Sequence, residues 1–371
     1  MSDERLLSTF LDLVRIDSPT GFEAACGEYC ADRLRSLGFT VRFDESAALT
    51  GSDIGNLIAE LPGTAPGVLA LSAHLDCVEP CRGVVPQVVD GIIVPEGETV
   101  LGADDKAGLA AALEAFERLV ESGRPRPALK ALFTVQEEIG LVGAKHLTAE
   151  DASCDLCLVL DAEGSPGAIV TAAPTHYTFA AEFYGRASHA GVAPERGVSA
   201  IRMAADAVSR MRLGRLDDST TANVGTIRGG TATNVIPPRC DMTGECRSLD
   251  RPTVEALKAE MNGALSAAAE AAGGSVDVTW KLEYEGFNYP DDSALLRLVA
   301  EACGSAGLAP STFRTGGGSD ANVLAGKGVP VLALACGMQG VHSTQEQLAV
   351  ADLAAVTGIC VAVAERMAEE R

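Results

Sequence analysis

Short apolar runs that alternate with helical patterns constrain the fold of this chain more than any other feature. The runs Val68–Ala73, Ala128–Val135 and Leu156–Leu160 are typical of buried strands. Between the first two, the Ala- and Leu-rich stretch Ala107–Glu121 has the composition of a helix. This rhythm predicts an α/β domain whose mixed sheet is covered by helices on both faces.

The pattern changes from Thr175 onward. Strand, helix, strand, strand, helix and strand follow one another, which predicts a compact α+β unit of the ferredoxin-like kind. The apolar strand Val329–Ala335 and a closing helix from Val350 then resemble the first part again. We therefore predict a discontinuous first domain, residues 1–174 and 287–371, interrupted by an inserted unit at 175–286.

Composition excludes several classes of partner. The chain has 371 residues and a formal net charge of −22, so it repels phosphate backbones and anionic lipids, and we expect neither nucleic-acid nor membrane binding. No apolar run approaches the roughly 18 residues of a membrane span. The start, MSDERLLSTF, has acids where a signal peptide needs basic residues, so we expect a cytoplasmic protein.

The chain contains eleven cysteines, whose spacing favours reduced core residues over a disulfide framework. Cys154 and Cys157 form a CxxC, which could bind zinc or act in redox chemistry. No second CxxC or nearby histidine completes a structural zinc site, and Cys157 lies in the apolar stretch DLCLVLD. Packed thiols are the favoured interpretation.

Histidine and carboxylate side chains recur where predicted strands end. In α/β sheets the crevice beyond the carboxyl ends of the strands is the usual position of a site. Five strand ends would thus deliver these groups to one edge of the sheet. The residues are His74 with Asp76, Asp104 with Asp105, Glu137 with Glu138, Asp161, and His342.

This mixture of imidazoles and carboxylates without thiolates suits Zn²⁺, and also Co²⁺ or Mn²⁺, in a hydrolytic site. Adjacent acids such as Glu137 and Glu138 also need a nearby cation, a proton or solvent to offset their repulsion. Two divalent ions would be neutralised by three ligating carboxylates and one bridging hydroxide. The charges therefore favour a two-metal centre that acidifies its bound water.

Several stretches resemble the M20 metallopeptidases and, within them, peptidase T and its relatives. The resemblance runs nearly from end to end of the chain. The matching stretches are SAHLD, LGADDKAG, TVQEEIGLVGAK, LVLDAEG, GRASHAG, GGTATNVIP, GGGSDANVLAGKGVPVLALACG and GVHSTQEQ.

This resemblance implies a complete set of metal ligands. One zinc would bind His74 and Asp161, the other would bind Glu138 and His342, and Asp104 would bridge both. Asp104 is preferred to Asp105 because the family's bridging carboxylate lies two positions before the lysine matched by Lys106. Glu163 is a weaker alternative to Asp161.

The resemblance also implies roles beyond metal binding. Glu137 would be the general base, and Asp76 would orient His74 through a hydrogen bond. The inserted unit resembles the family's lid and dimerisation domain. From this lid, His189 would reach the active site of a partner subunit and stabilise the oxyanion. Asn234 and Arg247 resemble substrate-holding positions, and the loop Gly316–Asn322 has no assigned role.

The leading hypothesis is a homodimeric, two-zinc exopeptidase of the aminopeptidase or tripeptidase type that acts on short peptides. Aspartate at the position of Asp161 accompanies aminopeptidases in the wider group, whereas glutamate accompanies carboxypeptidases and deacylases. One alternative is an amidohydrolase of N-acyl amino acids. Another is a noncatalytic, metal-stabilised peptide-binding protein, which the presence of Glu137 disfavours.

Overall fold

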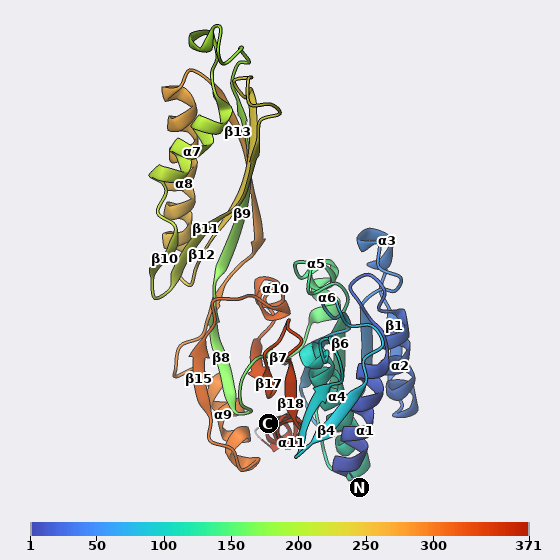
Figure 1. The fold of residues 1–371 in the computed structure, drawn as a ribbon. Coiled ribbons are helices and arrows are strands. Elements are labelled where there is room, and N and C mark those ends of the chain that lie inside the picture. The colour runs from blue at the N-terminus through green and yellow to red at the C-terminus, as the bar shows by residue number, and fades with distance from the viewer. Residues whose placement is uncertain (1, 370–371) are drawn as a thin grey trace. The chain divides into compact units, whose positions relative to one another are not determined.

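A computed structural model describes residues 2–369 of the chain (Figure 1). The chain forms two compact units. Unit 1 takes Met1–Thr171, Tyr289–Arg314 and Ser319–Arg371, and unit 2 takes Ala172–Asn288 and Thr315–Gly318. The inserted unit is thus a few residues longer at each end than the expected 175–286, and a short glycine-rich segment joins it from a distant part of the sequence.

A mixed sheet forms the centre of unit 1, with strand order β1-β2-β6-β3-β7-β16-β8 and with β15 also paired to β8. The neighbours β6, β3, β7 and β16 run parallel, so their carboxyl ends meet at one edge of the sheet. The strands are β1 (Thr40–Phe43), β2 (Leu57–Leu61), β3 (Val68–His74), β6 (Ala128–Thr134), β7 (Leu156–Ala162), β8 (Ala168–Ala173), β15 (Ser311–Arg314) and β16 (Val331–Ala335).

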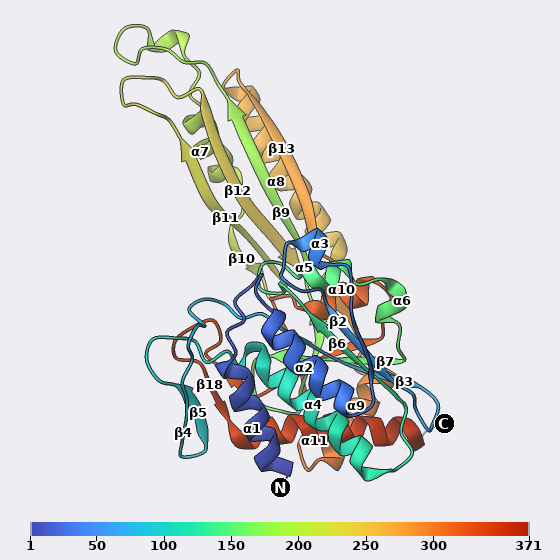
Figure 2. The ribbon, with the colours of Figure 1, turned by 90° about the vertical axis from the view of Figure 1, so that its right-hand side faces the viewer.

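Helix α4 (Ala103–Ser122) packs on β3 and β7 and is flanked by α1 (Ser2–Arg15), α2 (Ala24–Ser36) and α11 (Val350–Glu369) (Figure 2). Its small and aliphatic side chains are almost all buried, which explains why the stretch reads as Ala- and Leu-rich. The remaining helices of unit 1 are α3 (Ala47–Thr50), α5 (Val142–His146), α6 (Ala149–Ala152), α9 (Ala294–Ser305) and α10 (Asp320–Gly326).

A second, smaller sheet in unit 1 has the strand order β17-β18-β5-β4. Its strands are β4 (Pro86–Val89), β5 (Ile92–Pro95), β17 (Met338–Gln339) and β18 (Gln347–Ala349). The chain passes from β5 through a loop into α4, so Asp104 lies in the first turn of this helix. The prediction that five strand ends supply the site is therefore wrong for Asp104, because no strand of the central sheet precedes it directly.

Unit 2 is a five-stranded antiparallel sheet in the order β10-β11-β12-β9-β13. Helices α7 and α8 lie together on one of its faces (Figure 1). The order of β11, β12, β9 and β13 confirms the predicted ferredoxin-like unit, to which the short β10 is an addition. The elements are β9 (Thr175–Tyr184), η1 (Pro194–Arg196), α7 (Ala200–Arg210), β10 (Gly214–Asp217), β11 (Thr220–Gly229), β12 (Arg239–Ser248), α8 (Arg251–Ala271), β13 (Ser275–Tyr284) and β14 (Phe287–Asn288).

Pairing at the ends of unit 2 explains its observed limits. The two residues of β14 pair with Ala172 and Ala173 at the end of β8, which extends the unit beyond the predicted boundaries. Gly318 packs against the Tyr284 ring so closely that a Cβ atom would lie 2.3 Å from its Cζ. A larger residue here would displace the Tyr284 ring, so glycine permits the close packing of residues 315–318 on unit 2.

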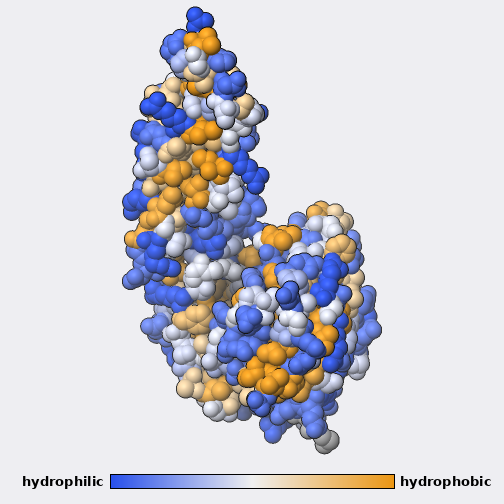
Figure 3. Space-filling view, in the orientation of Figure 1, coloured by the Kyte–Doolittle hydropathy of each residue, from blue (hydrophilic) through white to orange (hydrophobic). Residues whose placement is uncertain are grey.

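The surface of the face shown in Figure 3 is mainly hydrophilic, with smaller apolar areas between the polar ones. All eleven cysteines are free thiols, and ten of them are buried; only Cys154 is partly exposed. Among the residues described here, none of the helices combines the length and the apolar character needed to span a lipid bilayer.

Candidate metal centre

The predicted metal ligands of unit 1 converge. His74 ends β3, Asp161 lies near the end of β7, Glu138 follows β6, His342 lies in the loop between β17 and β18, and Asp104 begins α4. Nε2 of His74 is 3.0 Å from Asp104 Oδ1 and 3.7 Å from Asp161 Oδ1. Nε2 of His342 is 3.2 Å from Asp104 Oδ2 and 2.9 Å from Glu138 Oε2.

Asp104 occupies the position between the two imidazoles, because one carboxylate oxygen faces His74 and the other faces His342. Burial opposes ionisation of Asp104, but hydrogen bonds from the two histidines hold the pKa of its carboxyl below the usual value. Hydrogen bonds to Asp104 and Glu138 raise the pKa of His342 to about 10. A carboxylate placed in this way can bridge two cations.

The tautomer of His74 shows which nitrogen is available for a cation. Nδ1 lies 2.9 Å from the backbone carbonyl oxygen of Asp76, which can only accept a hydrogen bond. Nδ1 therefore carries a proton, and Nε2 faces Asp104 and Asp161. Either a second proton or a cation has to lie between Nε2 and these carboxylates, so the donor set fits a metal ion.

Two groups of side chains offer ligand atoms within 4.8 Å of one another. The first group is His74, Asp104 and Glu138, and the second is His74, Asp105 and Asp161. The oxygens of Asp105, however, accept hydrogen bonds from the backbone N–H groups of His74 and Gly108, each at 3.1 Å. Asp105 thus ties α4 to β3, whereas the oxygens of Asp104 face the histidine rings.

Glu163, the weaker alternative to Asp161, has a different environment. Its Oε1 accepts a hydrogen bond from the backbone N–H of Gly340 at 2.9 Å, so it holds the loop that leads to His342. Asp161 is the acid that faces His74. Burial raises the pKa of the Asp161 carboxyl well above its usual value.

Glu137 is a buried acid beside the cluster, and Asp76 positions its backbone. Oδ1 of Asp76 accepts the Glu137 N–H at 2.9 Å, and Oδ2 accepts the Glu138 N–H at 3.3 Å. The expected contact between the Asp76 carboxylate and the ring of His74 is longer, at 3.4 Å. Burial raises the pKa of the Glu137 carboxyl well above its usual value.

Sequence reasoning missed Glu346, which lies four residues after His342 and is only 1 % exposed. Its two carboxylate oxygens accept the backbone N–H groups of Gly102 and Asp104, at 2.7 Å and 2.9 Å. Glu346 therefore joins the loop of one predicted ligand to the loop of another. Its presence in the stretch GVHSTQEQ was the available signal.

A turn before α2 was also missed. Oδ2 of Asp76 accepts a hydrogen bond from Thr20 Oγ1 at 2.8 Å, and Glu23 Oε1 accepts the backbone N–H of Gln136 at 3.1 Å. Helix α2 begins after this turn, at Ala24. The sequence PTG, which favours a turn, was the available signal.

Two loops of the centre hold non-glycine residues in the left-handed region. His342 has φ of 60° and Gln136, which precedes Glu137, has φ of 53°. Such conformations cost on the order of 1–3 kcal/mol each and persist where the surrounding contacts determine them. Around Gln136, the carboxylates of Glu23 and Asp76 supply these contacts by accepting the backbone N–H groups of Gln136 and Glu137.

The sites predicted on unit 2 separate into two places. The backbone N–H of Ala190 donates to the Asn234 carbonyl at 2.9 Å, so His189 and Asn234 lie on adjoining loops. Arg247 pairs with His176 at the start of β9, whereas His189 follows the other end of that strand. Ten residues of strand span roughly 30 Å, so Arg247 and His189 of one chain are far apart.

Arg247 belongs to a polar cluster that sequence reasoning did not identify. Its Nη2 donates to Glu245 at 2.8 Å, and its Nη1 lies 3.3 Å from the Tyr284 hydroxyl and 3.4 Å from the Gly316 carbonyl oxygen. Nε2 of His176 is 2.8 Å from Glu245. Contacts with His176 and Arg247 lower the pKa of Glu245 to about 2, although burial opposes this shift.

Comparisons with known proteins agree with this architecture. Residues 173–272 match the family described as the peptidase dimerisation domain of M20 proteins, and residues 96–168 match M42 glutamyl aminopeptidase. The uncharacterized protein YqjE of Bacillus subtilis is 39 % identical, and the alignment covers 100 % of both chains.

Two solved structures are similar over 99 % of this chain and 99 % of their own. Aminopeptidase PepT from Bacillus cereus is 42 % identical with a TM-score of 0.94, and a tripeptidase from Staphylococcus aureus is 36 % identical with the same TM-score. The fold and the convergent acids and imidazoles define a metallopeptidase architecture. The chain belongs to the M20 metallopeptidases, within their peptidase T-like group.

Proposed function

We propose that this chain is a two-metal peptidase that hydrolyses short peptides in the manner of an aminopeptidase or tripeptidase. The proposal rests on the position of Asp104. Its Oδ1 faces His74, a predicted ligand of one metal, and its Oδ2 faces His342, a predicted ligand of the other. The similarity to proteins described as aminopeptidase PepT and tripeptidase supports the substrate class.

The ligand roles follow the contacts within unit 1. His74 and Asp161 would hold one ion, Glu138 and His342 the other, and Asp104 both. Zn²⁺ suits these nitrogen and oxygen donors, and Co²⁺ or Mn²⁺ are alternatives. When bound, the metal pair would acidify a water molecule and polarise the carbonyl group of the substrate.

Glu137 is suited to move the protons of the reaction. A carboxyl whose pKa is raised by burial can accept a proton from the attacking water and then donate it to the leaving amine nitrogen. Its backbone is fixed by Asp76, so its position does not depend on the metal alone. A peptide-binding protein without catalysis has no need of such a base.

The geometry of unit 2 supports a homodimer. If Arg247 holds the substrate and His189 stabilises the oxyanion of one site, the two residues have to come from different copies, because β9 separates them within one chain. Nδ1 of His189 accepts the backbone N–H of Gly191 at 3.2 Å, which leaves Nε2–H as an exposed donor. The many free thiols are consistent with work in the cytoplasm.

A substrate screen tests this proposal directly. Metal-free protein is reloaded with Zn²⁺, Co²⁺ or Mn²⁺ and incubated with dipeptides, tripeptides and N-acyl amino acids. We expect release of amino acids from the peptides. Cleavage of the N-acyl compounds alone would establish a deacylase instead, and peptide binding without hydrolysis under any metal would establish a binding protein.

A further inference from the structure

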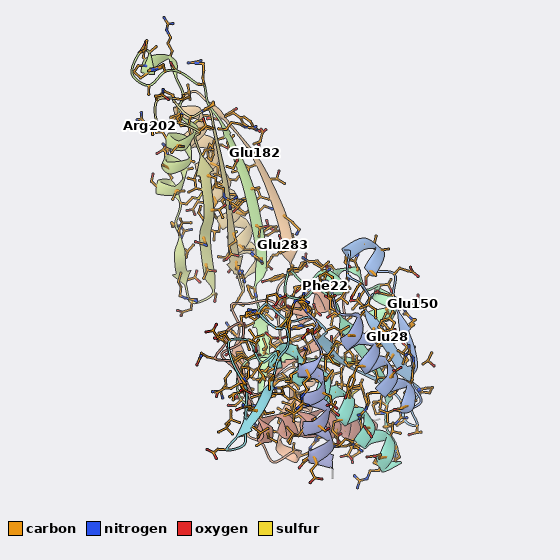
Figure 4. All side chains as sticks on the ribbon, turned by 45° about the vertical axis from the view of Figure 1, so that its right-hand side comes forward. Phe22, Glu28, Glu150, Glu182, Arg202 and Glu283 are labelled. Carbon is orange, nitrogen blue, oxygen red and sulfur yellow. The ribbon has the colours of Figure 1, made fainter. Side chains whose placement is uncertain are left out.

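An exposed aromatic ring lies on a fixed turn beside the candidate metal centre. Phe22 is 61 % exposed and precedes α2 at the surface of unit 1 (Figure 4). Its backbone N–H donates to the Pro19 carbonyl at 2.9 Å and closes the turn, in which Gly21 has φ of 89°. Its fixed position beside the predicted metal ligands, and not its exposure alone, makes this ring a candidate for a binding surface.

Hydrogen bonds hold both ends of this turn. Thr20 donates to Asp76, and Glu23 accepts from Gly21 and Gln136 through Oε1 and from Ser52 through Oε2. The turn is therefore attached to the segments that carry His74 and Glu137. These hydrogen bonds fix the backbone that carries Phe22. A ligand that binds the ring therefore does not have to order the turn, which would otherwise cost conformational entropy.

A second exposed apolar side chain lies on a segment that is hydrogen-bonded to the same acid, Asp76. Ile139 is 62 % exposed and directly follows Glu138. The Asp76 oxygen Oδ2 accepts both the Thr20 hydroxyl, at 2.8 Å, and the Glu138 N–H, at 3.3 Å. Phe22 follows Thr20 by two residues, and Ile139 follows Glu138 by one. The segments of both apolar side chains are thus hydrogen-bonded to the same oxygen of Asp76.

Arg82 covers part of the ring. Its guanidinium carbon lies 5.8 Å from the centroid of Phe22, and its Nε donates to Glu79 at 2.8 Å. The paired charges of Arg82 and Glu79 leave little net charge beside the ring. The ring and Ile139 therefore offer an apolar surface, and not a site for an anion or a cation.

We propose that Phe22 and Ile139 form an apolar subsite that receives an aliphatic or aromatic side chain of the substrate next to the cleaved bond. This inference rests on the proposed peptidase function and names the class of peptide it favours. A substrate side chain is the expected occupant because Phe22 and Ile139 lie on segments that are hydrogen-bonded to Asp76. Asp76 also positions Glu137, the proposed base for cleavage of the peptide bond.

The test compares peptides that differ in one side chain. The zinc-loaded wild type and the Phe22→Ala variant are assayed with glycyl-glycyl-glycine, leucyl-glycyl-glycine and glycyl-leucyl-glycine. We expect the wild type to prefer a leucine peptide. Phe22→Ala should lower kcat/KM for that peptide about tenfold, mainly through KM, and leave kcat/KM for triglycine nearly unchanged, as for a lost apolar pocket contact.

Controls separate this role from a structural one. Val89→Ala removes an apolar side chain that is 52 % exposed on β4. This variant should have the same kcat/KM as the wild type for each of the three peptides. Phe22→Leu keeps an apolar surface and should retain most of the preference. An equal loss with all three peptides, or a changed oligomeric state with unchanged preference, overturns the subsite. A wild type that cleaves none of the peptides rejects the peptidase function itself, and the subsite with it.

Discussion

The Asp76 carboxylate accepts the backbone N–H of Glu137 at 2.9 Å, while the backbone carbonyl of Asp76 accepts Nδ1–H of His74 at the same distance. Asp76 therefore orients the His74 ring, which faces the expected cation, and also positions Glu137, the proposed base. The two functions are coupled through a buried group, so small changes around Asp76 should affect metal binding and proton transfer together.

The Glu137→Gln variant separates proton transfer from metal binding. Glutamine keeps the size of the side chain and the backbone contact with Asp76, but it cannot accept a proton. We expect unchanged metal content and folding, with kcat lowered by about 10²-fold or more. Near-normal turnover, measured with the best peptide of the screen, would rule out the assignment of Glu137 as base.

The Glu346→Gln variant tests the link between the loops of Asp104 and His342. An amide has one acceptor oxygen, so it cannot hold the N–H groups of both Gly102 and Asp104. We expect a metal affinity lower by about 10- to 100-fold, measured by competition with a chelator, and an altered visible spectrum of the Co²⁺-loaded protein.

The matched control for this variant is Glu163→Gln. Glu163 also accepts a backbone N–H, that of Gly340, but it does so through one oxygen, and the amide oxygen of glutamine can still accept it. Its replacement should change the metal affinity much less. If both variants bind metal as tightly as the wild type, Glu346 only stabilises the fold.

The convergence of the predicted ligands could largely be expected from the sequence, because most of them follow strands with a simple pattern. Apolar runs fix β3, β6, β7 and β16, and parallel pairing then brings His74, Glu138 and Asp161 to one edge. The position of Asp104 could not be read this way. It depends on the start of α4 and on the hydrogen bond with Glu346, a residue 242 positions away in the sequence.

The supporting residues were hidden for a related reason. Thr20 donates to the Asp76 carboxylate, whereas Glu23 and Glu346 accept backbone N–H groups of distant segments. Such contacts leave no periodicity in the sequence. A single acid in a chain with 51 of them carries no signal of its own. The cluster of Arg247 with Glu245 and His176 was missed similarly, because the register of β9 and β12 creates it.

Gly108→Ala tests the packing of α4 beneath the site. A Cβ at Gly108 would lie 2.4 Å from Asp105 Oδ1 and 2.5 Å from the Leu160 carbonyl oxygen, next to Asp161. We expect a loss of roughly 1–3 kcal/mol in the free energy of unfolding and weaker metal binding. Gly263→Ala in α8, where a Cβ meets nothing within 4 Å, should instead be neutral or stabilising. Equal effects in urea unfolding would contradict this account.

Metal removal should destabilise unit 1. Burial raises the pKa of Asp105, Glu137 and Asp161, and the neighbouring carboxylate of Asp104 raises it further. A bound cation would offset both effects. We expect chelation to lower Tm and added Zn²⁺ to restore it, with a stabilisation of about 4 kcal/mol at a thousandfold excess over Kd. A Tm that does not respond to metal would argue against the centre.

Two inactive variants should restore activity together if His189 acts on the site of a partner subunit. In a dimer of His189→Ala with Glu137→Gln, one site has an intact Glu137 from its own chain and an intact His189 from the other. Random pairing of equal amounts makes about half of the dimers mixed, and one of their two sites is intact, so about a quarter of wild-type activity should return on co-expression. Each variant alone should stay nearly inactive. Mixed dimers should be verified with two affinity tags. If they show no recovery, His189 does not act in the partner's site. It would then have no part in catalysis, because β9 keeps it far from Arg247 in its own chain.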